Sequence, residues 1–493
     1  MAERTGRRAT VSWFDGELKL VDNIYDIAVI GAGVVGSAIA RELSRYDLNC
    51  VLVEAGPDVG VGTSKANTAI WHTGYDAKPG SLEARLLRRS DALLQAFVPQ
   101  AGIPFEQLGG LLVAWTEDQQ QALHGLLEKA HQNGDTDVRL VSAEEIHQRE
   151  PHLKAGALGG LFVPGESIFC PYTLPLALAT QAVLNGARLL LDHPVREISK
   201  ERDGTYLLNG PGGSVRCRYI VNAAGLYSDE INRLLGHHEF TVTPRRGELI
   251  VFDKFARSLV NHILLPVPTA ITKGVLISPT VYGNVMLGPT AEDLPDKTDT
   301  GTSDKGLRML WEKGEAILPA LMREEVTATY AGLRPATEHS DYQIRLHAEQ
   351  RYVCAGGIRS TGVSGCMGIA EYVVGLLSDA GLALPAKTEF KPVRMPYIGE
   401  TGLRPYQSAE MIAADPAYGQ IVCHCERVSL GEILDAAHAV IPARTVDGLR
   451  RLTRALQGRC QGFNCHAALV ALLAREARQN PDRLLMLEAD HVA

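Results

Sequence analysis

The first clear pattern in the chain is a short apolar run that ends in a cluster of glycines. Residues 25–30 read Tyr-Asp-Ile-Ala-Val-Ile, and Gly31 follows at once. A short apolar run bounded by glycine is typical of a buried parallel strand. A second such run spans residues 50–53, and the segment 34–45 between the two runs predicts a helix. After its polar leader, the chain therefore opens with a strand, a helix and a strand.

Strand and helix patterns keep alternating to about residue 378, which favours an α/β fold with inserted antiparallel strands. Prolines then follow one another through polar residues, which indicates a linker. Beyond the linker lie two close pairs of cysteines and a charged tail. Further helices are expected over residues 175–184, 367–377, 430–440 and 445–456.

The length of 493 residues is enough for two or three domains. The patterns above divide the chain into a leader over residues 1–24, a large domain over 25–378, a linker over 379–418, a small domain over 419–478 and a tail over 479–493.

Composition excludes some classes of protein. The chain carries 49 Lys and Arg against 57 Asp and Glu, a formal charge of -8, which argues against a nucleic-acid partner. No run approaches the ~18 apolar residues of a membrane-spanning helix, so we expect no transmembrane segment. The leader has Arg4, Arg7 and Arg8 but no apolar core, so we expect no secretory signal. These features suggest a cytoplasmic protein, peripheral to a membrane only through a partner, whose cysteines stay reduced.

The glycine cluster after the first strand has the spacing of a dinucleotide-binding turn. Gly31 would permit the tight turn, Gly33 would let backbone N–H groups approach a pyrophosphate, and Gly36 would let helix pack on strand. Val35 lies in the same turn. Glu54, at the end of the second apolar run, would accept hydrogen bonds from ribose hydroxyls, a role that a 2'-phosphate would disfavour. The ligand is therefore FAD or NAD rather than NADP.

Three later segments favour FAD. One has small and hydroxyl residues that suit a pyrophosphate and a ribityl chain, one is a strand that ends in small residues, and one is a glycine-rich loop that enters a helix. The positive end of that helix would stabilise a reduced flavin ring. The residues expected to contact the cofactor in these segments are Thr63, Ser64, Asn67, Ala224, Gly225, Gly357, Ser360, Thr361 and Gly362. A second dinucleotide fingerprint is not visible, so direct reduction of NAD is not expected.

The order of these segments over residues 25–378 resembles the FAD-dependent flavoproteins of the D-amino-acid-oxidase type. This superfamily includes glycine oxidase, 2-hydroxyglutarate dehydrogenase and glycerol-3-phosphate dehydrogenase. The resemblance implies a Rossmann-like FAD-binding lobe and an interleaved, mostly antiparallel substrate lobe, each discontinuous in sequence. It also implies that the backbone of Val195 contacts the adenine, although an ordinary strand residue would fit this position equally well.

The substrate pocket is expected to bind an anion. Arg334, in the segment Gly-Leu-Arg-Pro-Ala-Thr, resembles the family arginine that forks onto a substrate carboxylate or phosphate, and guanidinium suits that role because it is always charged and binds bidentately. Arg359 is a second candidate, with a structural ion pair as the alternative, and Arg246 is a weaker one. Some glycerol-3-phosphate enzymes carry a lysine close to Arg359, and its absence here weakens the assignment to phosphate.

Oxidation of an alcohol needs a base for the hydroxyl proton, and histidine is the default near neutral pH. His72, His262 and His339 are candidates. His72 lies in a Trp-His context on the segment that faces the flavin in relatives, so flavin contact, catalysis, covalent linkage to FAD and a purely structural role all stay open for it. Lys273 could also reach the pocket, but a solvated lysine is the simpler interpretation.

The cysteine pairs near the C-terminus have a spacing that suits a metal centre. Cys423, Cys425, Cys460 and Cys465 form a CxC pair and a Cx4C pair. Four thiolates in this pattern can hold iron–sulfur or zinc, and CxC fits structural zinc poorly. The pattern resembles the bacterioferritin-associated-ferredoxin type of domain, which implies a [2Fe-2S] cluster within a small helical domain. The other five cysteines are expected to be packing residues.

Together these features suggest an FAD-dependent dehydrogenase that oxidises a CH-OH group of a small anionic metabolite of the glycerol-3-phosphate type. Hydride would pass to flavin N5. The [2Fe-2S] centre would either relay electrons or have a purely structural role. An electron-acceptor protein or a quinone-linked partner would then take the electrons. The alternatives are a 2-hydroxy acid such as 2-hydroxyglutarate, a CH-NH substrate such as an amino acid, or a flavoprotein that only transfers electrons to a partner.

Overall fold

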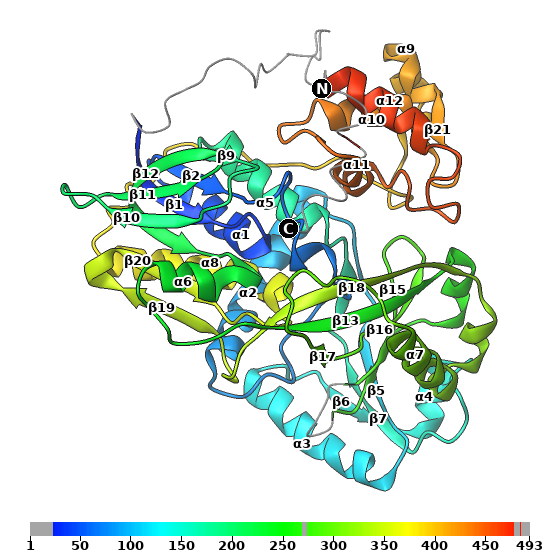
Figure 1. Cartoon of the computed structure of the whole chain (residues 1–493). Coiled ribbons are helices and arrows are strands. Elements are labelled where there is room, and N and C mark those ends of the chain that lie inside the picture. Colours follow the sequence, from blue (N-terminus) through cyan, green and yellow to red (C-terminus); the bar gives the residue numbers. More distant parts are fainter. Residues whose placement is uncertain (1–22, 269–273, 478–483, 485–493) are drawn as a thin grey trace.

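The computed structural model describes residues 23–268, 274–477 and 484. Most of the leader, Lys273 and nearly all of the tail beyond residue 478 lie outside this description. Figure 1 shows three parts: an upper lobe with the first strands of the chain, a lower lobe built around a second sheet, and a small C-terminal domain beside the upper lobe.

The upper lobe is built on a sheet that has eight strands in the described residues. They are β1 (Ile24–Ile30), β2 (Cys50–Val53), β9 (Arg188–Leu190), β10 (Glu197–Lys200), β11 (Tyr206–Gly210), β12 (Gly213–Asn222), β19 (Gln343–His347) and β20 (Tyr352–Gly356). The central strands β20, β12, β1, β2 and β9 run parallel, whereas β10, β11 and β19 are antiparallel additions. All four residues of β2 are buried, because helices and strands cover both faces of a parallel sheet.

Three helices cover one face of this sheet: α1 (Val34–Leu43), α5 (Thr173–Leu184) and α8 (Gly362–Asp379). Helix α2 (Leu82–Ala101) packs on α8. The helices predicted over residues 34–45, 175–184 and 367–377 are therefore present. Their observed ends differ from the predicted ends by at most five residues. On the opposite face of the sheet, α6 (Ser228–Leu234) contributes Ile231 to a second apolar core.

The lower lobe contains a nine-stranded sheet in the described residues, and all but one of its pairings are antiparallel. Its strands are β5 (Gly110–Ala114), β6 (Arg139–Val141), β7 (Gly159–Val163), β13 (Thr243–Phe252), β14 (Ile263–Pro266), β15 (Leu276–Pro279), β16 (Val285–Gly288), β17 (Glu292–Asp293) and β18 (Val326–Ala336). The helices α3 (Glu117–Asn133), α4 (Ala143–Arg149) and α7 (Asp304–Ile317) lie on its outer side. A small sheet of β3 (Ile70–Trp71), β8 (Ser167–Phe169) and β4 (Phe105–Gln107) completes the domain. The expected fold class is confirmed, with a mostly antiparallel substrate lobe interleaved with the FAD-binding lobe.

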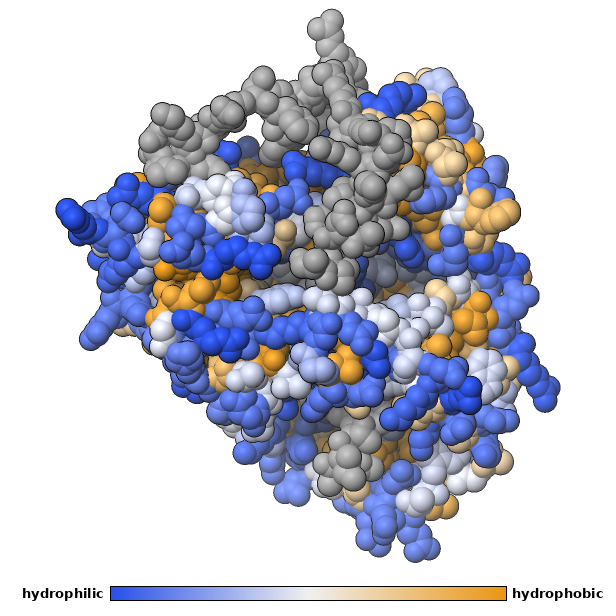
Figure 2. All heavy atoms as spheres, in the orientation of Figure 1, coloured by the Kyte–Doolittle hydropathy of each residue, from blue (hydrophilic) through white to orange (hydrophobic). Residues whose placement is uncertain are grey.

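After α8 the chain runs along the surface of the large domain instead of hanging free. Leu382, Val393, Met395 and Ile398 are buried in its main core. Apolar side chains hold this segment in place because their burial removes them from water. On the face drawn in Figure 2, hydrophilic residues predominate and apolar residues form small separate groups.

The C-terminal domain contains α9 (Ala409–Ala414), β21 (Ile421–Cys423), β22 (Val428–Ser429), α10 (Leu430–Ala437), α11 (Val446–Thr453) and α12 (His466–Ala477). Helix α12 lies inside the small domain expected over residues 419–478, although no helix was predicted after Cys465. Leu469 and Leu473 are four residues apart on one face of α12 and are buried in the core of this domain.

Candidate functional site

The turn between β1 and α1 is shaped by contacts that only glycine allows. A Cβ on Gly31, which has φ of +101°, would lie 2.5 Å from the carbonyl oxygen of Ala223. A Cβ on Gly36 would lie 1.8 Å from the carbonyl oxygen of Gly31. At Gly33 a Cβ would meet only the hydroxyl of Ser64 within 4 Å, at 3.3 Å. Gly31 and Gly36 therefore allow close packing, whereas Gly33 leaves room beside the start of the helix.

The first turn of α1 faces the end of the loop that precedes α8. The Val35 side chain comes within van der Waals distance, 3.9 Å, of the Cβ that an alanine at 362 would carry. The hydroxyl of Ser64 accepts a hydrogen bond from the Val34 N–H at 2.9 Å. The N-cap residue Gly33 provides no side-chain cap, so the other N–H groups at this end of the helix suit a phosphate.

Glu54 stands at the end of β2, beside the same turn. Its carboxylate accepts hydrogen bonds from the N–H of Ala32 at 2.7 Å and the N–H of Gly56 at 2.8 Å. Burial raises the pKa of Glu54, although these N–H groups oppose the shift. Further donors, such as the ribose hydroxyls of FAD, would stabilise the ionised carboxylate at this position.

The loop over residues 62–67 is tied to the substrate lobe. The hydroxyl of Thr63 donates to the carbonyl of Leu333 at 2.7 Å. The side chain of Asn67 donates to the carbonyl of Ser64 at 2.8 Å and accepts from the N–H of Ala69 at 2.8 Å. The side chains of Thr63, Ser64 and Asn67 therefore shape the loop, and its backbone is the part most able to meet a cofactor.

The remaining predicted cofactor residues fall in three places. Val195 and Ala224 are half-buried against the same apolar core, and Gly225 has φ of +56° with open space around it. Gly357 has φ of +64°, and Gly362 begins α8. Ser360 is exposed, whereas Thr361 is buried and donates to a carboxylate oxygen of Glu83 at 2.6 Å. These glycines, the open start of α1 and Glu54 fit the phosphates and ribose of FAD.

Arg334 lies on β18, which pairs with β13 so that Arg334 is opposite Arg245. One of its terminal nitrogens donates to the carbonyl of Thr290 at 2.8 Å, and its buried Nε has no hydrogen-bond partner. Within the described part of the chain, no carboxylate forms an ion pair with Arg334, although Asp293 is near enough to act on its pKa. Burial, together with the positive charge of Arg245, lowers the pKa of Arg334 to about 10. It remains cationic at neutral pH with donors to spare.

Arg246, one residue along β13 from Arg245, has a different environment. It pairs with Glu292 at 2.6 Å and Asp299 at 3.2 Å, and Glu248 lies 3.8 Å away. These carboxylates raise its pKa. Arg246 is therefore neutralised by protein groups, which makes it a structural residue of this lobe and a poor choice for substrate binding.

His72 follows β3 and pairs with a carboxylate that the sequence did not reveal. Its Nδ1 lies 2.7 Å from an Oε of Glu166, a residue whose side chain is fully buried. The other oxygen of Glu166 accepts from the N–H of Thr73 at 2.9 Å. The backbone of His72 donates to the hydroxyl of Ser364, in the first turn of α8, at 2.9 Å. A buried carboxylate thus orients this imidazole beside the loop that precedes α8, as a general base requires.

The other predicted residues near the pocket have structural partners. Arg359 is partly exposed and donates to the carbonyl of Ser340 at 2.6 Å, with Glu83 at 3.8 Å. His262 lies 2.7 Å from Glu150, and His339 contacts a backbone carbonyl at 3.0 Å. None of the partner groups in these contacts belongs to the groups that surround Arg334. Lys273 lies outside the described residues.

In the C-terminal domain the four cysteines come together as two pairs. The thiols of Cys425 and Cys460 interact directly, and so do those of Cys423 and Cys465. Within the described residues, no three of these sulfurs lie within 4.8 Å of one another. The sulfurs of a tetrahedral zinc site, with bonds of about 2.3 Å, would all be about 3.8 Å apart. Two separated pairs suit the two irons of a [2Fe-2S] cluster better.

Backbone N–H groups support the charged form of one thiol. Those of Asn464, Gly462 and Phe463 point at Cys460 and lower its pKa, the contribution of Asn464 being the largest. Burial raises the pKa of Cys465 to about 12, and the adjacent Cys423 adds to this shift. A bound metal ion would stabilise both thiolates through its positive charge and so keep these thiols deprotonated.

Ion pairs join the C-terminal domain to the large domain. Lys65, in the loop over residues 62–67, lies 3.0 Å from Asp447 of α11. Arg451 of the same helix lies 2.6 Å from Asp58. Asp447 also pairs with Arg451, so one network links the cofactor loop to α11.

A second network lies beside the cysteines. Arg454 is buried, contacts Glu426 at 2.9 Å and stacks over the ring of Tyr282 at 3.9 Å from the centroid. Lys254 of the substrate lobe reaches Glu426 at 3.1 Å. Glu426 is the residue after Cys425, so this junction fixes the loop of the first cysteine pair against the substrate lobe.

The described helices include none with both the length and the apolar character needed to cross a membrane.

Comparison with known proteins agrees with this geometry. Residues 26–376 match the family model described as FAD dependent oxidoreductase, and residues 421–475 match the model described as BFD-like [2Fe-2S] binding domain. Glycerol 3-phosphate dehydrogenase from Caloramator mitchellensis is 36% identical over 92% of this chain and 94% of that protein. L-2-hydroxyglutarate dehydrogenase from Bos taurus is 33% identical over 58% of this chain and 62% of that protein.

One solved structure is similar in both fold and sequence. It is the dithionite-reduced L-alpha-glycerophosphate oxidase from Mycoplasma pneumoniae with FAD bound, at a TM-score of 0.72 and 31% identity. The match covers 76% of this chain and all of that chain.

Proposed function

The chain belongs to the FAD dependent oxidoreductase family, and we propose that it oxidises the secondary hydroxyl of glycerol 3-phosphate, with Arg334 binding the phosphate. The enzyme is an FAD-dependent oxidoreductase with a C-terminal [2Fe-2S] domain. The observation that carries the choice of an anionic substrate is the isolation of Arg334, a partly buried guanidinium with a buried, unpartnered Nε and no carboxylate partner in the described part of the chain.

A buried cation without a counter-ion is costly, so its presence favours a ligand that supplies the negative charge. Arg334 keeps several N–H donors directed away from Thr290, and a phosphate offers acceptors in the geometry of a guanidinium fork. The similarity to glycerol 3-phosphate dehydrogenase over 92% of this chain supports phosphate over carboxylate.

His72 is the proposed base. FAD, when bound, supplies the two-electron acceptor, whose N5 takes a hydride from the carbon that bears the hydroxyl. The hydroxyl proton must leave at the same time, and we assign its acceptance to His72, because Glu166 fixes the orientation of the imidazole. Glu166 acts as a positioning residue, because its buried carboxylate orients the imidazole and stabilises its protonated form. The product is the corresponding ketone.

We also propose that the cluster passes single electrons from the flavin to an acceptor protein or a quinone-linked partner. The Lys65–Asp447 ion pair, which joins the cofactor loop to α11, supports a close approach of the two domains. Cys425 and Cys460 are only partly buried, and Phe463 between the second pair of cysteines is 91% exposed. This side of the cluster is thus open to a partner, as electron transfer between proteins requires.

The test is anaerobic reduction of the purified holoenzyme by a panel of substrates. Glycerol 3-phosphate is expected to bleach the flavin absorption, and 2-hydroxyglutarate and small amino acids to leave it unchanged over the same time. Bleaching by 2-hydroxyglutarate alone would replace the proposal with the hydroxy-acid reaction. A flavin that only dithionite reduces would favour an electron-transfer protein.

Variants separate the roles of the two side chains. Arg334→Ala is expected to abolish bleaching at substrate concentrations that saturate the wild type. His72→Asn is expected to slow bleaching by about a hundredfold or more with little change in substrate affinity. His262→Asn is the matched control, because His262 forms the same kind of pair with a buried glutamate, Glu150, but precedes β14, three strands away from β13 and the strand of Arg334. An unchanged rate of bleaching in His72→Asn would show that another group accepts the proton.

A further inference from the structure

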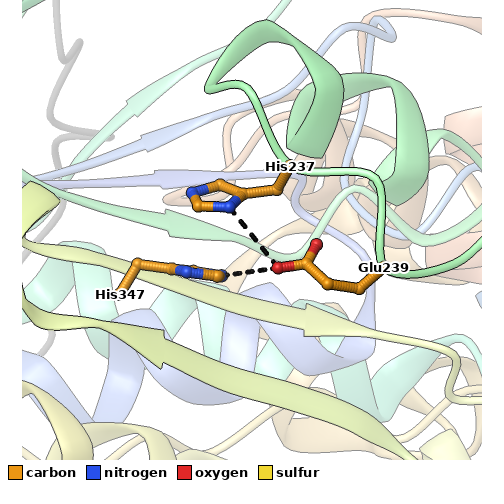
Figure 3. Close-up of side chains that lie close together, drawn as sticks. All are labelled: His237, Glu239 and His347. Carbon is orange, nitrogen blue, oxygen red and sulfur yellow. Dashed lines mark ion pairs between the residues drawn. The ribbon is translucent and has the colours of Figure 1, made fainter.

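Three side chains converge outside the flavin cradle and the cysteine domain. His237 and Glu239 lie on the connection that follows α6, and His347 is the last residue of β19. Figure 3 shows the two imidazoles one above the other, each with an ion-pair contact to the same carboxylate oxygen of Glu239. In the part of the chain that the structure describes, this is the one group of three or more His, Cys, Asp or Glu residues whose ligand atoms lie within 4.8 Å of one another.

Two of the three distances between these ligand atoms are close to those of ligands around one small ion. The Nδ1 of His237 lies 3.4 Å from an Oε of Glu239, and the Nε2 of His347 lies 3.6 Å from the same oxygen. Both separations are too long for a good hydrogen bond. Ligands bound tetrahedrally to zinc at 2.0–2.1 Å are about 3.3 to 3.4 Å apart. The site therefore has the dimensions of a metal centre more than those of a hydrogen-bonded triad.

The surroundings decide which nitrogen of His237 carries a proton. The amide of Gln350 donates to the carbonyl of Leu235 at 3.2 Å, which directs its oxygen at His237. That oxygen lies 2.5 Å from the Nε2 of His237, so Nε2 is the donor. The Nδ1 of a neutral His237 then presents a lone pair to the carboxylate of Glu239. Two electron-rich atoms facing each other need a cation between them, and metal-bound histidines commonly donate their second N–H in this way.

His347 and Glu239 are held in the forms that bind metals. The Nε2 of His347 is buried without a hydrogen-bond partner. Burial lowers the pKa of His347, and His237 lowers it further. Burial opposes ionisation of Glu239, but hydrogen bonds, including one from Asn232 at 2.7 Å, lower its pKa overall. Tyr352 stacks on both imidazoles and donates its hydroxyl to Asn232.

We propose that His237, Glu239 and His347 bind one divalent transition-metal ion, with zinc as the ion that fits best. Two neutral imidazoles and one carboxylate are a common zinc donor set that leaves a fourth position for water. The imidazoles are stacked with centroids 3.6 Å apart, so binding turns each ring about its side-chain torsions to aim its lone pair at the ion. The ion would clamp the connection after α6 to β19, on the FAD-binding lobe.

The experiment uses the full-length holoenzyme with flavin and cluster in place. The protein is treated with EDTA, dialysed against micromolar zinc and analysed for zinc, iron and flavin. We expect about one zinc per chain with the iron content unchanged, and an unfolding midpoint that rises with zinc. His347→Asn and Glu239→Gln are each expected to weaken zinc binding by about a hundredfold or more. His238→Ala removes an exposed neighbouring histidine and is expected to bind zinc as the wild type does.

The outcomes are distinct. A wild type that retains no zinc at micromolar free metal would overturn the proposal. So would equal zinc in the wild type and in both ligand variants, which would indicate binding elsewhere, and so would zinc that appears only as iron is lost from the cysteines. Glu239→Gln preserves the shape of the side chain, so it decides the matter if His347→Asn folds poorly. Oxidation of substrate does not enter the readout, so the result is independent of the proposed function.

Discussion

Arginine side chains in two regions of this molecule have opposite electrostatic environments. In the substrate pocket, Arg334 has a backbone carbonyl as its partner and its pKa is lowered by burial to about 10. At the junction with the C-terminal domain, Arg451 contacts Asp58 and Asp447, and Arg454 contacts Glu426. Burial opposes the charge of these two arginines as well, but the carboxylates raise the pKa of both.

The direction of these shifts separates two uses of the same side chain. A raised pKa means that the folded protein stabilises the cation, so Arg451 and Arg454 serve the structure. A lowered pKa means that the fold disfavours the cation, so Arg334 weakens stability, which agrees with the ligand-binding role that we propose for it. Four changes test this contrast.

The largest effect is expected from Arg334→Gln. A phosphate bound through two charged hydrogen bonds gains roughly 4 kcal/mol, so kcat/KM for glycerol 3-phosphate should fall about a thousandfold. The unfolding midpoint should stay unchanged or rise, because a disfavoured cation is removed. Steady-state kinetics and calorimetry on the same preparation measure both quantities. If Arg334→Gln lowered the unfolding midpoint and left kcat/KM unchanged, Arg334 would serve the structure and would not bind the substrate.

The second effect is expected from Arg454→Met at the junction. Removing one partner of a buried ion pair costs about 3 kcal/mol or more, because Glu426 stays buried beside only Lys254. The C-terminal domain should therefore unfold or separate at lower temperature, while the KM for substrate is unchanged. Calorimetry and limited proteolysis of the holoenzyme report on this. The double variant Arg454→Met with Glu426→Gln should recover part of the loss, and an equal or larger loss would contradict the ion-pair explanation.

A smaller effect is expected from Asp58→Asn. Arg451 would keep its contact with Asp447, so the loss in unfolding free energy should be about 1 kcal/mol. Denaturation in urea measures it. Asp203→Asn, which alters a surface ion pair with Arg216, is the control and should cost less. If Asp58→Asn lost as much unfolding free energy as Arg454→Met, the remaining contact of Arg451 with Asp447 would not compensate for the lost contact with Asp58.

The smallest effect is expected from pH. Anion binding needs the charged form of Arg334, which is present below its pKa and lost as the pH rises through about 10. The KM should therefore about double between pH 8 and pH 10. Kinetics across this range should show the rise in the wild type and not in Arg334→Gln. A wild-type KM that stays constant from pH 8 to pH 10 would show that the bound phosphate or another group keeps Arg334 protonated.

The sequence predicted a large part of the fold because its signals are local. The strand at Ile24–Ile30 and the helix from Val34 are set by an apolar run and three glycines within a few residues. The helix at His466–Ala477 was not predicted, although its apolar run over residues 467–474 is a local signal of the same kind. Glu166 was missed as well, since nothing near it in the sequence relates it to His72, 94 residues away.

By itself, the sequence determined the dinucleotide turn, the two cysteine pairs and the arginines that were candidates for an anion site. Only the tertiary structure separated Arg334 from Arg246, because their partners come from other strands and loops. It alone joined Arg451 to Asp58, 393 residues away, and His347 to Glu239. The physical reason is that backbone patterns depend on neighbours in the chain, whereas the charge state of a side chain depends on whatever the fold brings within a few ångströms.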